Sequence, residues 1–401
     1  MSVPALRFKQ DDGQDFPEWQ EKPFKDVSKI NQGLQIPISD RFAEGGENRH
    51  FYITNEFLRK DAKNQYFIEN PPSSVLCSES DVLMTRTGNT GKVVTNVKGA
   101  FHNNFFKISY DRNILIKDFL CEFLCLEHTQ SLILKLAGTS TIPDLNHSDF
   151  YKIKFRFPSL PEQTKIANFL TAVDEKISLL TQKHDLLSQY KKGVMQQIFS
   201  QELRFKDDDG GDFPEWKESI LSNIVSSPIT YGVVKPDKED VNGVKLIRGG
   251  DVSQGKISAN LRTISKEISQ QYKRTILQGG ELIVSLVGNP GEVAIVPKDL
   301  IGANLARQVG LVRLVKEINS LFVLYFLTFT TEIITSKITG SVQKVINLED
   351  LQKLKIQTPT FVEQTKIANF LTAIDDKITA TQSQLEAVKQ YKQGLLQQMF
   401  V

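Results

Sequence analysis

Two copies of one unit make up most of the sequence. Three motifs occur twice: LRFK at 6–9 and 203–206, DFPEW at 15–19 and 212–216, and EQTKIANFLTA at 162–172 and 363–373. The first two motifs return after 197 residues and the third after 201, so the second copy holds a net four additional residues between them. This repeat constrains the fold more than any single motif, because both halves must then fold in the same way.

The ends of the two copies predict a nearly closed circle. Phe199 is followed by three residues and then by the second LRFK motif, whereas Phe400 is followed only by Val401. Five residues precede the first LRFK motif, so joining the last residue to the first would nearly restore this spacing. Two equal units closed head to tail predict an internal pseudo-twofold repeat, the intrachain equivalent of a symmetric dimer.

A long helix is predicted at the end of each copy. Residues 162–199 contain no proline, and a seam of mostly apolar positions recurs at alternating steps of four and three residues, which is a heptad pattern. The seam positions are Ile166, Leu170, Val173, Ile177, Leu180, His184, Leu187, Lys191, Val194 and Ile198, and the second copy repeats them 201 residues later. Each helix would be about 55–60 Å long. We expect the two helices to pair antiparallel as a rigid spacer; the alternative is a coiled coil that serves only dimerisation.

The segment before each long helix predicts an α+β domain with an antiparallel or mixed sheet. Residues 81–92 form a strand followed by a Gly-Asn loop, and residues 281–292 match them. An apolar helix follows in each copy, at 117–136 in the first. By contrast, residues 22–68 and 220–268 differ almost wholly, which is expected if the two domains recognise different targets.

The chain therefore divides into four parts. These are a first globular domain at 1–160, a central spacer helix at 161–200, a second globular domain at 201–361 and a C-terminal spacer helix at 362–401. The predicted fold class is α+β, with two globular domains separated by two long antiparallel coiled-coil helices. The single tryptophan of each copy, Trp19 and Trp216, is expected to wedge the leading segment against the helix ends.

Composition excludes several broad classes. A formal net charge of +2 over 401 residues rules out a strongly basic nucleic-acid coat protein, although it permits a local basic surface. Three cysteines are too few for a disulfide framework and suit a reducing compartment. The chain opens without the apolar core of a signal peptide, and its longest apolar run, at 321–327, is too short to span a membrane. We therefore expect a cytoplasmic protein without a membrane partner.

No catalytic or metal site is predicted. The sequence has no Gly-x-Gly dinucleotide fingerprint and no phosphate-binding P-loop. Cys121, Cys125 and His128 have a metal-like spacing on a helix, but Val323, Leu327 and Thr330 take their places in the second copy. We therefore expect the two cysteines to be core residues.

The loops carry the side chains that bind base edges and phosphates. Arg, Lys, Asn, Thr and Gln form these hydrogen bonds, and glycines beside them let a backbone approach closely. For each residue the alternative is a solvated loop position. The candidate DNA-binding residues are Arg86, Thr87, Asn89, Lys92, Asn103 and Asn104 in the first copy, and Arg248, Asn289, Asn304, Arg307, Gln308, Gln343 and Lys344 in the second.

The whole chain resembles the specificity (S) subunits of type I restriction–modification systems. The resemblance rests on the DFPEW motif, the EQTKIANFLTA helix starts and the QYK-x-G motifs at 189–193 and 390–394. It implies that each globular domain is a target recognition domain that reads one half of a bipartite, asymmetric DNA site. The helices would set the gap between the halves and carry two modification (methyltransferase) subunits.

The resemblance also implies the remaining partners and cofactors. The modification subunits would methylate adenine N6 with S-adenosylmethionine, and two restriction subunits would add ATP- and Mg-dependent translocation and cleavage of double-stranded DNA. This chain would then hold no cofactor and have no catalysis of its own. Two other interpretations remain open. One is a pseudo-symmetric coiled-coil scaffold that does not read DNA, and the other is a self-sufficient nuclease or methyltransferase.

Overall fold

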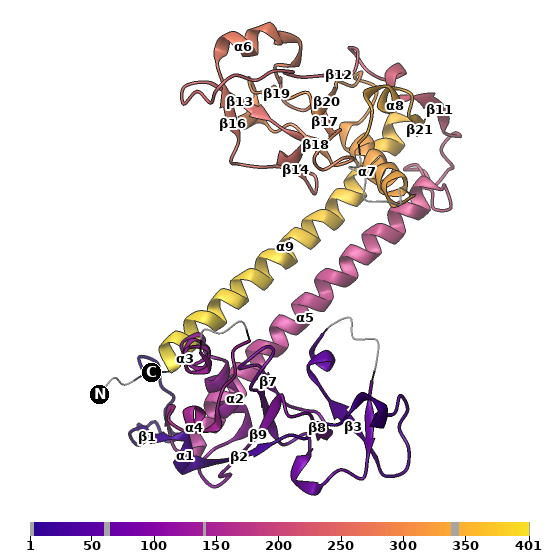
Figure 1. The fold of residues 1–401 in the computed structure, drawn as a ribbon. Coiled ribbons are helices and arrows are strands. Elements are labelled where there is room, and N and C mark those ends of the chain that lie inside the picture. The colour runs from indigo at the N-terminus through magenta and orange to yellow at the C-terminus, as the bar shows by residue number, and fades with distance from the viewer. Residues whose placement is uncertain (1–3, 60–64, 139–141, 338–344, 401) are drawn as a thin grey trace. The chain divides into compact units, whose positions relative to one another are not determined.

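The computed structural model describes residues 4–59, 65–138, 142–337 and 345–400 (Figure 1). These residues form two compact units, and each is described by itself. Unit 1 comprises Met1–Leu180 and Gln384–Val401, and unit 2 comprises Thr181–Ser383. Both units combine sheets with helices, so the predicted α+β class is confirmed. Two of the predicted DNA-binding residues, Gln343 and Lys344, lie outside the described residues.

Two four-stranded sheets form the body of unit 1. The first is antiparallel with the order β2-β9-β6-β7, and the second has the order β4-β3-β8-β5, in which β3 and β8 are parallel. A separate pair, β1 and β10, joins the leading segment to the residues before the long helix. The strands are β1 (Gln20–Pro23), β2 (Ser28–Gln32), β3 (Arg49–Ile53), β4 (Phe67–Glu69), β5 (Leu76–Cys77), β6 (Val82–Thr85), β7 (Val93–Val94), β8 (Gly99–Phe101), β9 (Phe105–Tyr110) and β10 (Lys154–Phe157).

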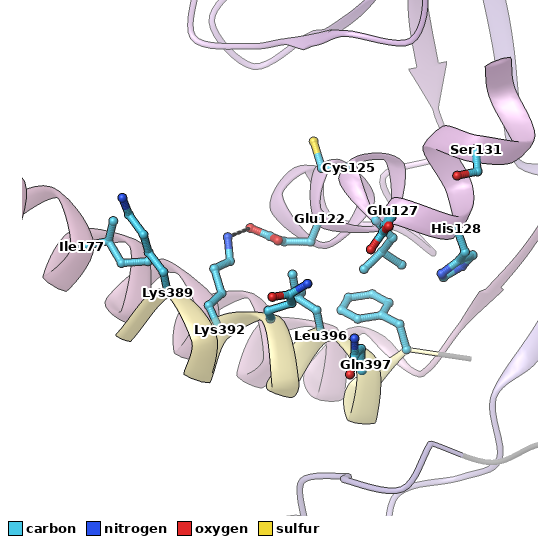
Figure 2. A pocket seen from close by; sticks show the side chains of 13 residues that line it. Glu122, Cys125, Glu127, His128, Ser131, Ile177, Lys389, Lys392, Leu396 and Gln397 are labelled. Carbon is cyan, nitrogen blue, oxygen red and sulfur yellow. Dashed lines mark hydrogen bonds and ion pairs between the residues drawn. The ribbon is translucent and has the colours of Figure 1, made fainter. Parts of the chain in front are cut away.

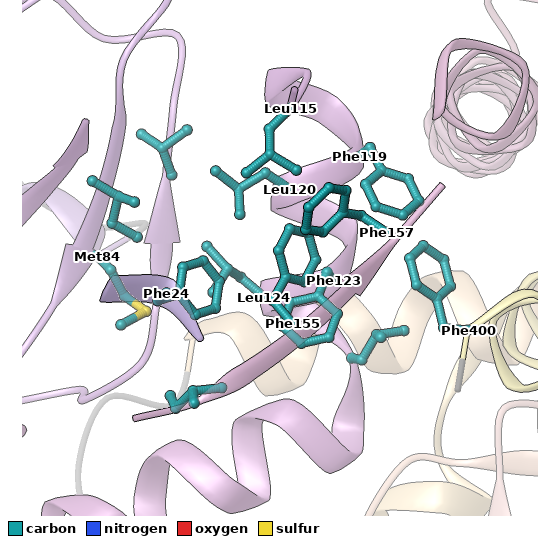
Figure 3. Close-up of a cluster of buried hydrophobic side chains, with 14 of the residues drawn as sticks. Phe24, Met84, Leu115, Phe119, Leu120, Phe123, Leu124, Phe155, Phe157 and Phe400 are labelled. Carbon is teal, nitrogen blue, oxygen red and sulfur yellow. The ribbon is translucent and has the colours of Figure 1, made fainter. Parts of the chain in front are cut away.

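The helices of unit 1 cover the first sheet and complete its core. They are α1 (Phe24–Val27), α2 (Lys117–Cys125), α3 (Glu127–Ala137) and α4 (His147–Phe150). Figure 3 shows the centre of this core, where the ring of Phe155 lies 5.2 Å from that of Phe24 and 4.3 Å from that of Phe123, centroid to centroid. Phe400, at the end of the chain, stacks on Phe119 in the same cluster.

The predicted helix over 117–136 is interrupted in the structure. Leu126 adopts φ −59° and ψ 140°, which ends α2 and starts α3 in a new direction. The side chain of Leu126 is buried. The break leaves the carbonyl oxygen of Leu124 without a helical partner, and the side-chain amide of Gln130 donates to it instead. The break also leaves Cys125 exposed, so the prediction that both cysteines are core residues is wrong for Cys125.

Unit 2 repeats the same architecture with different residues. Its main sheet has the order β12-β20-β17-β18, which matches β2-β9-β6-β7 of unit 1. Its second sheet contains a parallel pair, β13 and β19, that matches β3 and β8. The strands are β11 (Lys217–Ile220), β12 (Thr230–Tyr231), β13 (Val244–Ile247), β14 (Val252–Ser253), β15 (Lys256–Ile257), β16 (Arg262–Ile264), β17 (Leu282–Ser285), β18 (Val293–Ile295), β19 (Asn304–Leu305), β20 (Val309–Val312) and β21 (Lys355–Thr358), and the helices are α6 (Lys266–Gln271), α7 (Ser320–Lys337) and α8 (Leu348–Gln352).

The shared frame extends into the stretches whose sequences differ. Gly33 in unit 1 lies against the end of β8, and Gly232 in unit 2 lies against β19. A Cβ atom at these glycines would meet the carbonyl oxygens of His102 and Leu305 at 2.2 Å and 1.8 Å, respectively. The residue after each glycine then donates its N–H to the matching carbonyl, of Phe101 in unit 1 and of Leu305 in unit 2. Residues 22–68 and 220–268 thus differ in side chains but keep this backbone contact.

The two long helices are α5 (Leu160–Phe199) and α9 (Phe361–Met399). Every predicted seam position on both helices is buried or half-buried, whereas most other positions are exposed. In unit 1 the last part of α9 packs on the first part of α5, and in unit 2 the last part of α5 packs on the first part of α9. Within each unit the packed segments therefore run in opposite directions.

Buried ion pairs explain why the three motifs recur. Arg7 of the first LRFK motif donates to both carboxylate oxygens of Glu162, which begins EQTKIANFLTA, and to the carbonyl oxygen of Pro17 in DFPEW. Arg204 makes the same three contacts, with Glu363 and Pro214. Both glutamate side chains are fully buried. Each set of motifs therefore forms one interaction that docks the leading segment on the start of a long helix.

The leading segments also join the ends of the helices in the same way. The N–H of Leu203 donates to the carbonyl oxygen of Gln197 near the end of α5, and the N–H of Leu6 donates to that of Gln398 near the end of α9. Residue 6 therefore follows the end of α9 as residue 203 follows the end of α5. Trp19 contacts Phe400 just after the end of α9, as predicted, whereas the ring of Trp216 contacts that of Phe322 on α7.

Candidate nucleic-acid interface

A tight glycine loop connects β6 and β7 in unit 1. Gly88, Asn89 and Gly91 have φ angles of 73°, 113° and 90°, the left-handed region in which side chains other than those of Gly and Asn are strained. The N–H of Gly91 donates to the carbonyl oxygen of Thr85, and the amide of Gln130 on α3 donates to the carbonyl oxygen of Gly91. The loop is therefore anchored at its base, and Gly88 and Asn89 at its tip are exposed.

The loop between β17 and β18 in unit 2 has the same anchors. The N–H of Gly291 donates to the carbonyl oxygen of Ser285, and the hydroxyl of Thr331 on α7 donates to that of Gly291. Gly288 lies so close to the turn at Gly249–Asp251 that a Cβ atom would meet the N of Gly250 at 2.8 Å. Loop and turn therefore form one rigid surface.

Arg86 begins the glycine loop of unit 1 and is held by a carboxylate. Its Nε lies 2.8 Å from Oδ1 of Asp144, and its Nη2 lies 2.6 Å from Oδ2. Asp144 lies in the segment between α3 and α4, where the N–H of Leu145 donates to the carbonyl oxygen of Arg86. Both Asp144 and Arg86 keep exposed surface, with 46% and 20% of their side chains accessible.

Arg248 in unit 2 is held in the same manner from a different position. Its Nε lies 3.1 Å from Oδ2 of Asp251 and its Nη2 lies 3.0 Å from Oδ1. The ion pair with Asp251 raises the pKa of the Arg248 guanidinium, so it stays charged. Arg248 follows β13, the strand that matches β3, whereas the residue that begins the glycine loop of unit 2 is Leu286.

The other candidates lie in or beside these loops. In unit 1, Thr87, Asn89 and Lys92 belong to the glycine loop, and Asn103 and Asn104 form the turn before β9, where the Asn104 carbonyl accepts the N–H of Arg86. In unit 2, Gln308 accepts the N–H of Leu286 at the matching place, and the side chain of Asn289 donates to the carbonyl of Val252. Arg307 is exposed, and its side chain has no partner among the residues that the structure describes.

Asn304 does not lie on this surface. Its side chain is fully buried, where it accepts from the hydroxyl of Thr275 and donates to Ser269. The prediction that Asn304 contacts DNA is therefore corrected: in this position it fixes α6 and the following turn to the sheet. Asn304 begins β19, which pairs in parallel with β13, and both residues of this short strand are buried.

Sequence reasoning missed the carboxylates that hold the two arginines. Asp251 follows Arg248 by three residues, a spacing that suggests a short turn but does not reveal an ion pair. Asp144 lies 58 residues after Arg86, so nothing local connects them. The amide of Asn55 was also missed; it donates to the carbonyl oxygen of Thr87 and supports the glycine loop of unit 1.

A cavity of about 890 Å³ lies elsewhere in unit 1, between α2–α3 and the end of α9 (Figure 2). Cys125 and His128 line it, yet no cluster of three or more metal-ligating side chains occurs in the described part of the chain. Lys392 on the cavity wall donates to Glu122 of α2 and to Asp174 of α5. Burial lowers the pKa of Lys392, but the two carboxylates outweigh it and raise that pKa overall, whereas burial raises the pKa of Glu122.

Unit 2 contains the matching ion pair. Lys191 of α5 donates to Asp375 of α9, and the hydroxyl of Tyr325 on α7 donates to the same carboxylate. These pairs account for Lys191 and Lys392, which occupy the one seam position that is polar in both copies. Asp174 and Asp375 thus bind lysines of the paired helix segment.

No described helix is long and apolar enough to cross a membrane.

The fold is that of a type I restriction–modification specificity subunit. A crystal structure of such an S subunit from M. genitalium matches 100% of this chain and 99% of its own, with a TM-score of 0.63 and 16% identity. A structure described as showing complex assembly and conformational transition of the type I R-M system matches 95% of this chain and 97% of its own, with a TM-score of 0.59 and 16% identity.

The sequence comparisons define the family. The model of the type I restriction modification DNA specificity domain matches residues 17–189 and 207–390, and the chain belongs to this family. It is 25% identical to the MjaVIII specificity subunit of Methanocaldococcus jannaschii, over 97% of this chain and 94% of that protein. It is 31% identical to the EcoBI specificity subunit of Escherichia coli, over 58% of this chain and 54% of that protein.

Proposed function

We propose that the two globular domains each read one half of a bipartite, asymmetric DNA site. The observation that carries this proposal is one backbone frame with different side chains at matching positions of the glycine-loop surface. Arg86 is replaced by Leu286, Lys92 by Glu292 and Asn103 by Arg307, so two different base sequences would be preferred. The proposed DNA-contacting set comprises Arg86, Thr87, Asn89, Lys92, Asn103, Asn104, Arg248, Asn289, Arg307 and Gln308.

The long helices would set the gap between the two half-sites. The antiparallel packing within each unit, the buried heptad seam and the matching Lys–Asp pairs support a paired, rigid spacer. In this proposal the helices also dock two modification subunits, whose S-adenosylmethionine-dependent methylation of adenine N6 is directed by this chain. Two restriction subunits would add ATP- and Mg-dependent cleavage.

The proposal assigns no catalysis and no cofactor to this chain. It is supported by the type of side chain that the described glycine-loop surface offers, namely arginine, amide and hydroxyl groups suited to hydrogen bonding with bases. Recognition and chemistry would then lie on different subunits of one complex.

The methylome of a host that expresses this chain with its modification subunit tests the proposal. The host should lack other adenine methylation, and N6-methyladenine should be mapped by long-read sequencing. We expect one asymmetric motif with two short specific parts and a fixed gap. A soluble complex that adds no methylated motif would instead favour the scaffold interpretation. Methylation or cleavage by this chain alone would revive the self-sufficient enzyme.

A further inference from the structure

We infer that Asp144 and Asp251 are positioning residues that hold Arg86 and Arg248 for the recognition of one guanine in each half-site. The inference rests on the proposed DNA-reading function. Its starting point is that the two arginines occupy different places on the shared frame, yet each is held by a carboxylate that accepts from its Nε and Nη2. Arg86 lies on the glycine loop and is held from another loop, whereas Arg248 lies on the adjacent turn and is held from within it.

The geometry of the two ion pairs leaves one edge of each guanidinium available. In both pairs the carboxylate accepts from Nε and Nη2. A guanidinium has five N–H donors, so Nη1 and the outer N–H of Nη2 remain. These two parallel donors match the O6 and N7 acceptors that guanine presents in the major groove. Adenine offers a donor at the corresponding place and would be rejected.

The same ion pairs make phosphate binding a poor role for these arginines. An arginine whose charge is already neutralised by a carboxylate adds little to the attraction of the DNA backbone, and the carboxylate itself repels phosphate. A carboxylate that fixes the rotamer instead reduces the conformational freedom that must be lost when the base is bound. The arginine–carboxylate pair therefore contributes more to discrimination between bases than to general affinity for DNA.

Arg307 provides the contrast within the chain. It is exposed, lies beside Gln308 in the turn before β20, and has no side-chain partner among the described residues. Its free charge suits a phosphate contact. Replacing Arg307 should weaken binding to all DNA sequences alike and reduce the dependence of affinity on salt by about one counterion.

The experiment uses the full chain in complex with its modification subunit and duplexes that carry the motif found in the methylome. Each guanine in turn is replaced by 7-deazaguanine, which lacks the N7 acceptor. For the unmodified chain we expect one guanine in each half-site whose replacement weakens binding at least ~5-fold, the lower limit for losing a good bidentate contact. Arg86→Ala and Arg248→Ala should each make binding insensitive to one of these replacements.

The aspartates are tested with Asp144→Asn and Asp251→Asn, which keep the shape and an acceptor oxygen. We expect each to reduce the preference for guanine ~3-fold or more without weakening binding to unrelated DNA, because removing a carboxylate removes a charge that repels phosphate. Glu21→Gln and Glu218→Gln are matched controls, because these carboxylates pair with Arg156 and Lys355 away from the glycine loops. Both controls should leave the preference unchanged. Thermal unfolding of every variant checks the fold.

Three results would overturn the inference while leaving the proposed function intact. They are a motif that lacks guanine in either half, aspartate variants that keep the full preference, and aspartate variants that weaken binding to all sequences equally. A failed proposed function has a different signature, because no methylated motif would then exist.

Discussion

Among the contacts between the repeated motifs of unit 1, the ion pair of Arg7 and buried Glu162 should be the one whose loss destabilises the fold most. Arg7→Ala removes two hydrogen bonds to the carboxylate, at 3.0 and 2.7 Å, and leaves a fully buried charge without its partner. Breaking such a pair from one side costs about 3–5 kcal/mol. In a unit of roughly 200 residues each kcal/mol lowers the melting temperature by about 2–4 °C. The expected decrease is therefore about 6–20 °C.

The chain offers a built-in assay for this prediction. Its only tryptophans, Trp19 and Trp216, lie in different units, so fluorescence in a Trp216→Phe background reports unit 1 alone. Lys9→Ala is the matched control, because the Lys9–Asp15 pair is exposed, and exposed pairs contribute about 0–1 kcal/mol. Combining Arg7→Met with Glu162→Met should restore most of the loss, since an apolar pair leaves no unpaired charge.

A shift for Arg7→Ala no larger than that of Lys9→Ala would refute this reasoning. It would mean that the recurrence of the motifs does not reflect a buried ion pair. Arg204→Ala, observed through Trp216, should repeat the result in unit 2, because Arg204 makes the same contacts with Glu363 and Pro214.

Two further predictions concern the helices. Seven residues inserted after Leu180 alone should abolish or shift methylation. Seven residues inserted after both Leu180 and Thr381 should lengthen the gap in the methylated motif by about 10 Å, or roughly three base pairs. An unchanged gap in the double insertion would contradict the spacer role. Glu122→Gln should raise the melting temperature at pH 7, because burial raises the pKa of Glu122 in the folded state and makes its ionised form costly. The gain should vanish as the pH falls through the raised pKa of Glu122 towards its pKa in the unfolded chain, because Glu122 is then protonated in both the folded and the unfolded state. A gain in melting temperature that persists at low pH would refute this cause.

The repeat made much of the frame predictable from the sequence. Motifs that return at fixed spacing must make the same contacts, and the heptad seam predicted which helix positions are buried. The Gly-Asn loops were predictable because few residues other than glycine and asparagine adopt positive φ angles. These features depend on local patterns or on the comparison of the two copies.

Features that depend on tertiary pairing were not predictable. Asn304 is buried in a strand whose parallel partner lies 58 residues earlier in the sequence. The exposed Cys125 lies next to a helix break at Leu126 that no proline or glycine marks. The carboxylate that holds Arg86 comes from a segment beyond two helices. Proximity to a glycine loop in the sequence therefore did not reveal which polar side chains face outward.

The central claim is that two globular domains with the same backbone architecture recognise different DNA half-sites. A chain that carries two copies of the first globular domain tests this claim most directly. Residues 1–202 followed by residues 6–199 would give such a chain, with the junction at the place where Leu203 naturally follows Glu202. Its methylome, in complex with the modification subunit, should show a palindromic split motif whose two parts repeat one half of the native site. A motif that keeps the second native half, or an asymmetric motif from this chain, would contradict the account.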